Sequence, residues 1–80
     1  MLDIMAQQLA EAFPDDQAEL DGDGYKFVAT VVSASFEGAN TLARHKRVYA
    51  ALDTYIKSGE LHALTIRAYT PEEWSTRPAD

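Results

Sequence analysis

The chain has 80 residues, a net charge of −6 and 46% hydrophobic residues, so we expect one small globular domain over residues 1–80. It contains no cysteine, which excludes a disulfide framework and any thiolate metal site built by this chain alone. No apolar run reaches the ~18 residues of a membrane span, and the first residues lack the basic segment of a signal peptide, so we expect a cytoplasmic protein without membrane contact.

The negative charge is concentrated in the N-terminal third of the chain. Residues 25–80 carry seven bases and six acids and sum to +1. The first 24 residues contain no Lys or Arg and seven acids: Asp3, Glu11, Asp15, Asp16, Glu19, Asp21 and Asp23. An acidic domain is a poor non-specific binder of nucleic acid, although the remaining two thirds leave room for a local basic face.

The first half of the chain predicts one helix and two strands. Apolar residues at spacings of three and four indicate a helix over residues 3–13, which Pro14 ends. A short strand over residues 17–20 follows. The DGDG sequence at residues 21–24 is typical of a tight hairpin turn, and it lacks the longer run of oxygen ligands of a calcium loop. Residues 25–32 are β-branched and aromatic, which predicts a strand buried on both faces.

The second half predicts a long helix, a strand and a short helix. The main helix covers residues 41–56, with a break near residues 44–47 and Gly59 as its C-terminal cap. Residues 61–69 predict a strand. The TPEEW sequence that begins at Thr70 is a helix start, with an N-cap, proline at the first position and acids near the positive end of the dipole. We expect residues 75–80 to form a frayed tail.

The order of elements is therefore αββαβα. The first two strands form an antiparallel hairpin, and a right-handed crossover through the main helix places the last strand parallel to the second. Helices on one face of a three-stranded mixed sheet give an α+β fold.

No motif of a common enzyme class is present. The chain has no Gly-x-Ser-x-Gly elbow, no P-loop and no dinucleotide-binding glycine pattern, and Asp53 and Glu60 give no triad spacing. His45 lies on the apolar stripe of the main helix, so we interpret it as structural. His62 precedes the last strand, where its parity favours the inward face but its position lets it reach solvent. Imidazole suits zinc, copper or iron, yet a metal here would need ligands from a partner.

A compact basic cluster lies near the start of the main helix. Arg44, Lys46 and Arg47 follow Ser35 and Thr41 closely in sequence. One interpretation is a solvated helix face, which is the commoner case. The other is a set of phosphate contacts at a helix N-terminus, where so few bases would give weak binding to DNA.

Several motifs together resemble the BolA family. They are Phe36-Glu37-Gly38, Leu42, Arg44-His45, Val48-Tyr49, Leu52, His62-Ala63-Leu64, Ile66 and Thr70-Pro71-Glu72-Glu73-Trp74. The resemblance covers nearly the whole chain, and the brief hairpin makes it most similar to the short acid-stress branch of that family. It implies a fold similar to the class II KH domain, in agreement with the order of elements above.

The resemblance also implies two functions. In the first, the protein is a non-enzymatic iron–sulfur adaptor that pairs with a monothiol (CGFS) glutaredoxin and shares a [2Fe-2S] cluster with it. The partner's cysteine and a glutathione thiol are then ligands, and His62 is the ligand from this chain. In the second, the protein is a stress-linked, DNA-binding transcriptional regulator, with Arg44, Lys46 and Arg47 as its phosphate contacts. A plainer alternative is a protein-interaction module that only occupies the glutaredoxin face.

Two departures from the family pattern matter. The family often has a second His or Cys in the loop before the second strand, whereas residues 21–26 contain neither. The Gly-x-x-Gly loop of KH domains is also missing, so RNA clamping of the KH type is not supported. We therefore expect the cluster to be held jointly and not by this chain alone, and the free chain to be a monomer.

Overall fold

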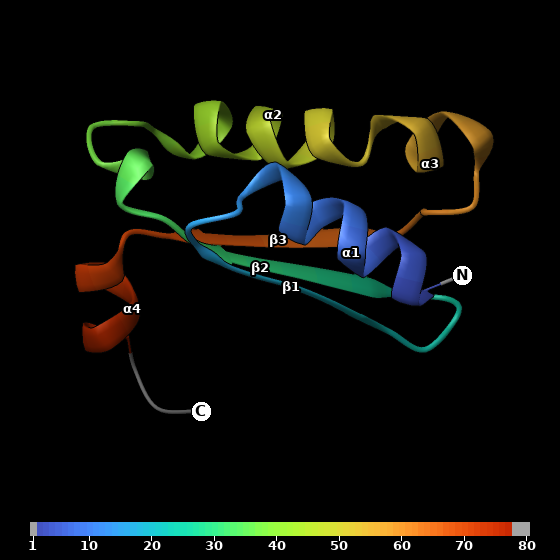
Figure 1. Ribbon diagram of the computed structural model, residues 1–80, viewed down its shortest axis with the longest axis horizontal. Helices are drawn as coiled ribbons and strands as arrows, with labels where there is room; N and C mark the ends of the chain where they lie inside the picture. The colour runs from blue at the N-terminus through green and yellow to red at the C-terminus, as the bar shows by residue number, and fades with distance from the viewer. Residues whose placement is uncertain (1, 78–80) are drawn as a thin grey trace.

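Three strands form a mixed sheet in the order β1-β2-β3 in the computed structural model, which describes residues 2–77 (Figure 1). β1 (Gln17–Gly22) runs antiparallel to β2 (Phe27–Val32), and β2 runs parallel to β3 (Leu64–Tyr69). The predicted antiparallel hairpin and the parallel pairing of the last strand with the second are therefore confirmed.

Four α-helices and one 3₁₀ turn complete the fold within the described residues. They are α1 (Leu2–Ala12), η1 (Ala34–Phe36), α2 (Thr41–Ala51), α3 (Asp53–Ser58) and α4 (Pro71–Thr76). With α2 and α3 as one interrupted helix, the order is the predicted αββαβα. None of these helices is both long and apolar enough to cross a membrane.

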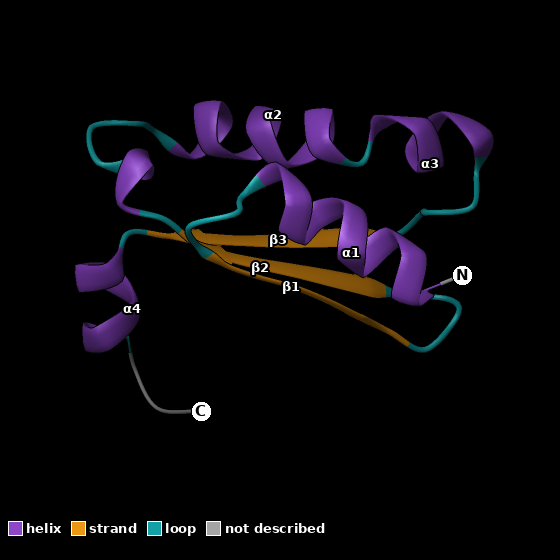
Figure 2. Ribbon diagram, in the orientation of Figure 1, coloured by secondary structure: helices purple, strands orange, loops and turns teal. Residues whose placement is uncertain are grey.

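The core lies between α1 to α3 and the inward face of the sheet (Figure 2). Alternate residues of β2, Phe27, Ala29 and Val31, point into it and are at most 5% exposed. The register places Leu20 of β1 and Ile66 of β3 on either side of Ala29. On the other face of β2, Val32 is buried but Val28 and Thr30 are only partly buried, so the predicted burial on both faces holds only at the end of the strand. In the described part of the chain, no helix layer covers the rest of that side of the sheet.

The main helix is interrupted later than predicted. α2 continues through residues 44–47 to Ala51 and is capped by Leu52, whose φ of −113° and ψ of 14° leave the helical range. Leu52 is fully buried, and its carbonyl accepts hydrogen bonds from the amides of both Tyr55 and Ile56. The helix is therefore interrupted at a buried residue without leaving that carbonyl unpaired.

Two strands begin later than predicted, because the residues directly before them adopt turn or left-handed conformations. The carboxylate of Asp23 accepts hydrogen bonds from the amides of Tyr25 and Lys26, both at 2.8 Å, which assigns these residues to the hairpin turn and not to β2. Ala63 has a φ of 49°, which no strand residue adopts, so β3 starts at Leu64.

The helix predicted after β3 is confirmed, but α4 departs from the expected one-face arrangement. Thr70 and Glu73 form a capping box, and the helix continues to Thr76, into the segment predicted as a frayed tail. Residues 78–80 lie outside the described residues. The Tyr69 side chain points away from the core, since it alternates with Ala68, and Trp74 packs on its ring at 5.4 Å. This contact holds α4 beside the end of the sheet, away from α2 (Figure 1).

Gly22 at the end of β1 gives a test of this packing. A Cβ atom added there would lie 2.4 Å from Cδ1 of Phe27, whose ring is 5% exposed and has little room to move. We expect Gly22→Ala to lower the free energy of unfolding by about 1–3 kcal/mol through overpacking, measured by urea denaturation. The neighbouring exposed Asp21→Ala is the control, and equal stability of the two variants would contradict this packing.

Candidate functional site

His62 lies at the surface in the loop that joins α3 to β3. Its side chain is exposed, and its ring packs edge-on against the ring of Phe27, with 5.9 Å between the centroids. The sequence left open whether this histidine points inward or reaches solvent, and the structure places it in solvent. Its ring nitrogens are thus open to a ligand from outside the chain.

The backbone on both sides of His62 is held firmly. Leu61 is buried, and its amide donates to the carbonyl of Tyr55 at 3.0 Å. On the other side the carbonyl of Ala63 accepts from the amide of Phe27 at 3.2 Å. Ala63 has a left-handed φ of 49°, which costs a residue with a Cβ about 1–2 kcal/mol. Strain of this kind persists only where surrounding contacts impose it, and it is often found at functional sites.

The β1–β2 hairpin lies at the same end of the sheet as the His62 loop (Figure 1), because Phe27 bonds the residue after His62. In this hairpin the amides of Lys26 and Tyr25 donate to the Asp23 carboxylate and hold its pKa below the ordinary value of 3.8. Tyr25 is 78% exposed. The hairpin tip thus carries an exposed phenol and an exposed ammonium group at the same end of the sheet as the histidine.

The chain itself does not assemble a complete metal site in the described part. Among residues 2–77, no group of three or more His, Cys, Asp or Glu side chains is placed to hold a metal ion. His45, the other histidine, is half-buried on α2, far along the chain from the His62 loop. Any metal at His62 therefore takes most of its ligands from another molecule.

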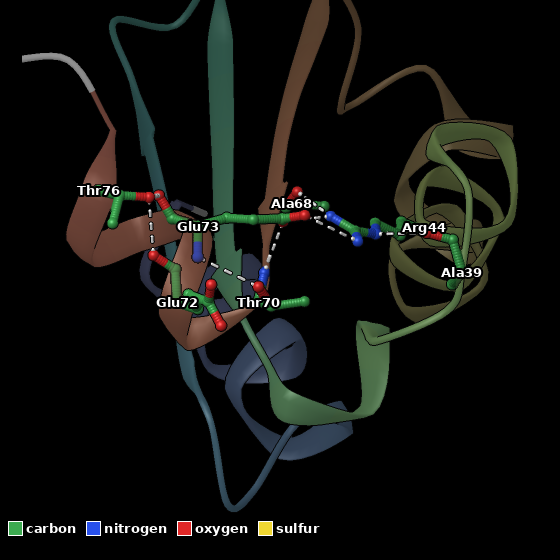
Figure 3. Close-up of polar contacts among 7 residues, drawn as sticks. All are labelled: Ala39, Arg44, Ala68, Thr70, Glu72, Glu73 and Thr76. Atoms are coloured by element: carbon green, nitrogen blue, oxygen red, sulfur yellow. Dashed lines mark hydrogen bonds and ion pairs between the residues drawn. The ribbon is translucent and has the colours of Figure 1, made fainter.

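Arg44, predicted as a phosphate contact, is bound within the chain (Figure 3). Its Nε donates to the carbonyl of Ala39 at 2.9 Å and its Nη1 to the carbonyl of Ala68 at 3.2 Å. The guanidinium also forms a two-point ion pair with Glu73 at 2.6 and 3.3 Å. Arg44 therefore links α2, β3 and α4. Its side chain is only 13% exposed, so it offers little charge to solvent.

Of the other predicted contact residues, Arg47 is also bound within the fold, whereas Lys46 and Thr41 are exposed. Nη1 of Arg47 donates to Oγ of Ser35 at 2.8 Å, and its guanidinium lies over the ring of Phe36 at 4.9 Å. Thr41 and Lys46 are exposed on α2. The structure therefore brings Arg47 and Ser35 together, as their proximity in sequence suggested, but directs both arginines to partners in the fold.

Sequence reasoning missed two residues of these sites. Glu73 was predicted as an acid in the first turn of the last helix but not as the partner of Arg44, which is 29 residues away. Ala63 gave no signal at all, because a left-handed conformation is expected of Gly, Asn or Asp.

The family model for BolA-like proteins matches residues 3–73. The chain belongs to the BolA-like family. This match confirms the resemblance inferred from the motifs.

Relatives of this BolA-like protein span most of its length. A protein from the rpoN–murA intergenic region of Acinetobacter guillouiae is 46% identical over 70 residues, which are 88% of this chain and 84% of its own. The acid stress protein IbaG of Escherichia coli K12 is 34% identical over 67 residues, 84% of this chain and 80% of its own. The structure of a BolA protein homologue from Coxiella burnetii matches with a TM-score of 0.77 at 33% identity, covering 94% of this chain and 96% of that one.

The ion pair between Arg44 and Glu73 predicts an acid-dependent loss of stability. Arg44 and the amide of Thr70 hold the pKa of Glu73 below its ordinary value of 4.5. A carboxyl group whose pKa is lower in the folded state stabilises the fold above that ordinary value and loses this effect as the pH falls through the folded pKa. We therefore expect Glu73→Gln to lower the melting temperature at pH 7, and the difference from the wild type to shrink progressively below pH 4.5.

The exposed pair of Lys57 and Asp53, at 3.0 Å, is the matched control. Asp53→Asn removes a surface ion pair of the same charge type, and such pairs contribute little to stability. Thermal unfolding followed by circular dichroism between pH 3 and 7 measures both variants. The assignment fails if Glu73→Gln and Asp53→Asn differ from wild type equally at every pH.

Proposed function

We propose that this BolA-like protein is a non-enzymatic adaptor in iron–sulfur cluster handling that acts with a monothiol glutaredoxin. The observation that supports this most is His62, an exposed imidazole in a loop anchored on both sides, in a chain without cysteine. In this proposal His62 is the ligand from this chain to a [2Fe-2S] cluster, and the partner's cysteine and glutathione supply the thiolates.

The chemistry of the donor fits such a shared cluster. Imidazole nitrogen replaces thiolate on one iron in known [2Fe-2S] centres, and the cluster supplies the iron to which the nitrogen binds. His62 has the exposure this requires, while the firm backbone around it limits the entropy lost when it binds. A single neutral nitrogen donor binds the cluster iron weakly, which suits a cluster that is transferred to another protein.

The alternative, a DNA-binding regulator, has less support from the contacts of the basic cluster. The guanidinium groups of Arg44 and Arg47 both bind partners within the fold. Lys46 and Arg47 are exposed, but the Arg47 guanidinium is held by Ser35 and Phe36, so Lys46 is the one of the three without such a partner in the described part of the chain, which is a small charge to set against the net −6 of the chain. We therefore do not extend the proposal to DNA.

The two histidines provide a test of the ligand role. Replacing a thiolate by imidazole changes the visible spectrum of the cluster, so we expect the wild type to alter the visible circular dichroism of a cluster-loaded monothiol glutaredoxin. His62→Ala should abolish this change while the melting temperature stays within a few degrees, because the side chain is exposed. His45→Ala, at a half-buried site, should keep the change but lower stability. The ligand role is wrong if the His62→Ala complex has the wild-type spectrum.

The hairpin beside His62 allows the missing second ligand to be added. Lys26 directly precedes Phe27, whose amide bonds the carbonyl of Ala63 next to His62. We expect Lys26→His to slow the loss of cluster from the mixed complex, since a second imidazole from the same chain adds chelation. The decay of cluster absorbance under a fixed chelator concentration measures this. Equal decay of Lys26→His and the wild type would show that the hairpin is not next to the cluster.

A further inference from the structure

β3 is an edge strand of the sheet, so the backbone N–H and C=O groups of alternate residues point toward β2 and away from the sheet. The carbonyls of Ala63 and Tyr69 accept hydrogen bonds from the amides of Phe27 and Ser33, so the odd-numbered residues of this strand face β2. Because successive residues of a strand point their polar groups to opposite sides, the even-numbered residues face outward. The carbonyl of Ala68, which receives Arg44, confirms this direction.

Only part of this edge is covered. Arg44 and its partner Glu73 occupy the Ala68 end. Within the described residues, no strand lies beyond β3 and no hydrogen bond outside the strand ladder reaches Leu64 or Ile66. These two residues therefore present unpaired backbone N–H and C=O groups, and this open stretch begins two residues after His62.

The flank of α2 above this edge is apolar and exposed. Arg47 lies over the ring of Phe13, so its flank of the helix faces α1, which packs on β1. Leu42 and Tyr49 are seven residues apart and share the opposite flank, since 3.6 residues make one turn. Because α2 packs on β3 while α1 packs on β1, the flank of α2 that points away from α1 lies on the outer, β3 side of the sheet. Leu42 is 63% exposed and Tyr49 44%, unusual for large apolar side chains of a helix that packs on a core.

We propose that the outward backbone groups of Leu64 and Ile66, with the side chains of Leu42 and Tyr49, form a β3-edge surface that binds an extended strand of the partner protein. The inference rests on the proposed function, since the partner is the glutaredoxin that shares the cluster at His62. Unpaired amides and carbonyls at strand spacing are satisfied by another polypeptide backbone. An apolar side chain of the added strand then contacts Leu42 and Tyr49.

Two observations favour this occupant over a second copy of the chain. A partner that places a cluster against His62 lies beside the open stretch, because the stretch starts two residues further on. Two copies would instead bring together chains of net charge −6, which repel each other. The surface is also short, so it gives a partner a few directional hydrogen bonds and leaves the cluster ligand to supply the remaining affinity.

Hydrogen exchange of individual amides tests the strand addition directly. The isotope-labelled chain is mixed with a saturating excess of apo monothiol glutaredoxin, which avoids broadening of signals by the cluster and compensates for the weaker binding of the edge contact alone. We expect the amides of Leu64 and Ile66 to exchange fast in the free chain and at least ~10-fold more slowly in the complex. The amide of Thr65, which faces β2, should be slow in both states.

Charged substitutions test the apolar flank. Leu42→Glu and Tyr49→Glu should each weaken binding of the glutaredoxin by about tenfold or more, measured by calorimetry, since each places a charge against the added strand. Ile4→Glu is the matched control, because Ile4 is a large apolar residue on α1 with 56% exposure, away from β3. It should bind as the wild type does.

The outcomes separate this surface from the proposed function. If the cluster spectrum forms normally with Leu42→Glu and the two amides stay unprotected in the complex, the surface is wrong and the adaptor function stands. If His62→Ala leaves the cluster spectrum unchanged but the amides are protected, the surface stands and the ligand role is wrong. Absence of any binding to glutaredoxin overturns both. Protection of the two amides in a dimer of the free chain, shown by sedimentation, overturns the surface in favour of a second copy.

Discussion

The parallel pairing of β2 with β3 is the constraint on which the rest of the structure depends. Parallel strands cannot be joined by a tight turn, so the chain must leave β2, cross the sheet through a helix and return. The pairing is closed at one end by the bond from Phe27 to Ala63 and at the other by the bond from Ser33 to Tyr69. The first closure positions His62, and the second lies beside the Arg44–Glu73 ion pair. The two ends of one strand pair thus carry the exposed histidine and the ion pair that links α2 to α4.

Arg44 shows how a residue type can mislead when its position is not known. A cluster of three bases near a helix start suggests a phosphate site, yet the guanidinium has a planar fork of donors that also suits carbonyls and a carboxylate at a strand end. Here it covers the outward carbonyl of Ala68 and holds Glu73 of α4. An exposed edge strand can pair with strands of other chains, and Arg44, which covers one end of β3, shortens the part of the edge that is free to do so. The same side chain therefore limits both the basic surface and the free edge.

The sequence predicted most of the fold because its local signals agree with its long-range pattern. The hairpin, the central apolar strand and the Thr70 helix start each depend on a few neighbouring residues, and each was confirmed. The turn, however, lies two residues later than the predicted DGDG sequence, because Asp21 and Gly22 extend β1. The errors occurred where tertiary contacts override local preference. The helix is interrupted at Leu52 and not near residues 44–47, because the backbone leaves the helical conformation at this fully buried residue. The ion pair of Arg44 with Glu73 spans 29 residues, and no local pattern reports such a pair.

The exposure of His62 and the open stretch of β3 are linked by their separation of two residues. Either contact alone would be weak: one neutral nitrogen gives a metal little affinity, and two residues of strand edge give few hydrogen bonds. When one partner engages both, the second contact forms within the complex and benefits from a high effective concentration. Loss of either contact then returns the partner to weak binding. In the proposed complex, such a surface would hold the partner while a cluster joins the two proteins and would release it once the cluster is lost, as the proposed adaptor function requires.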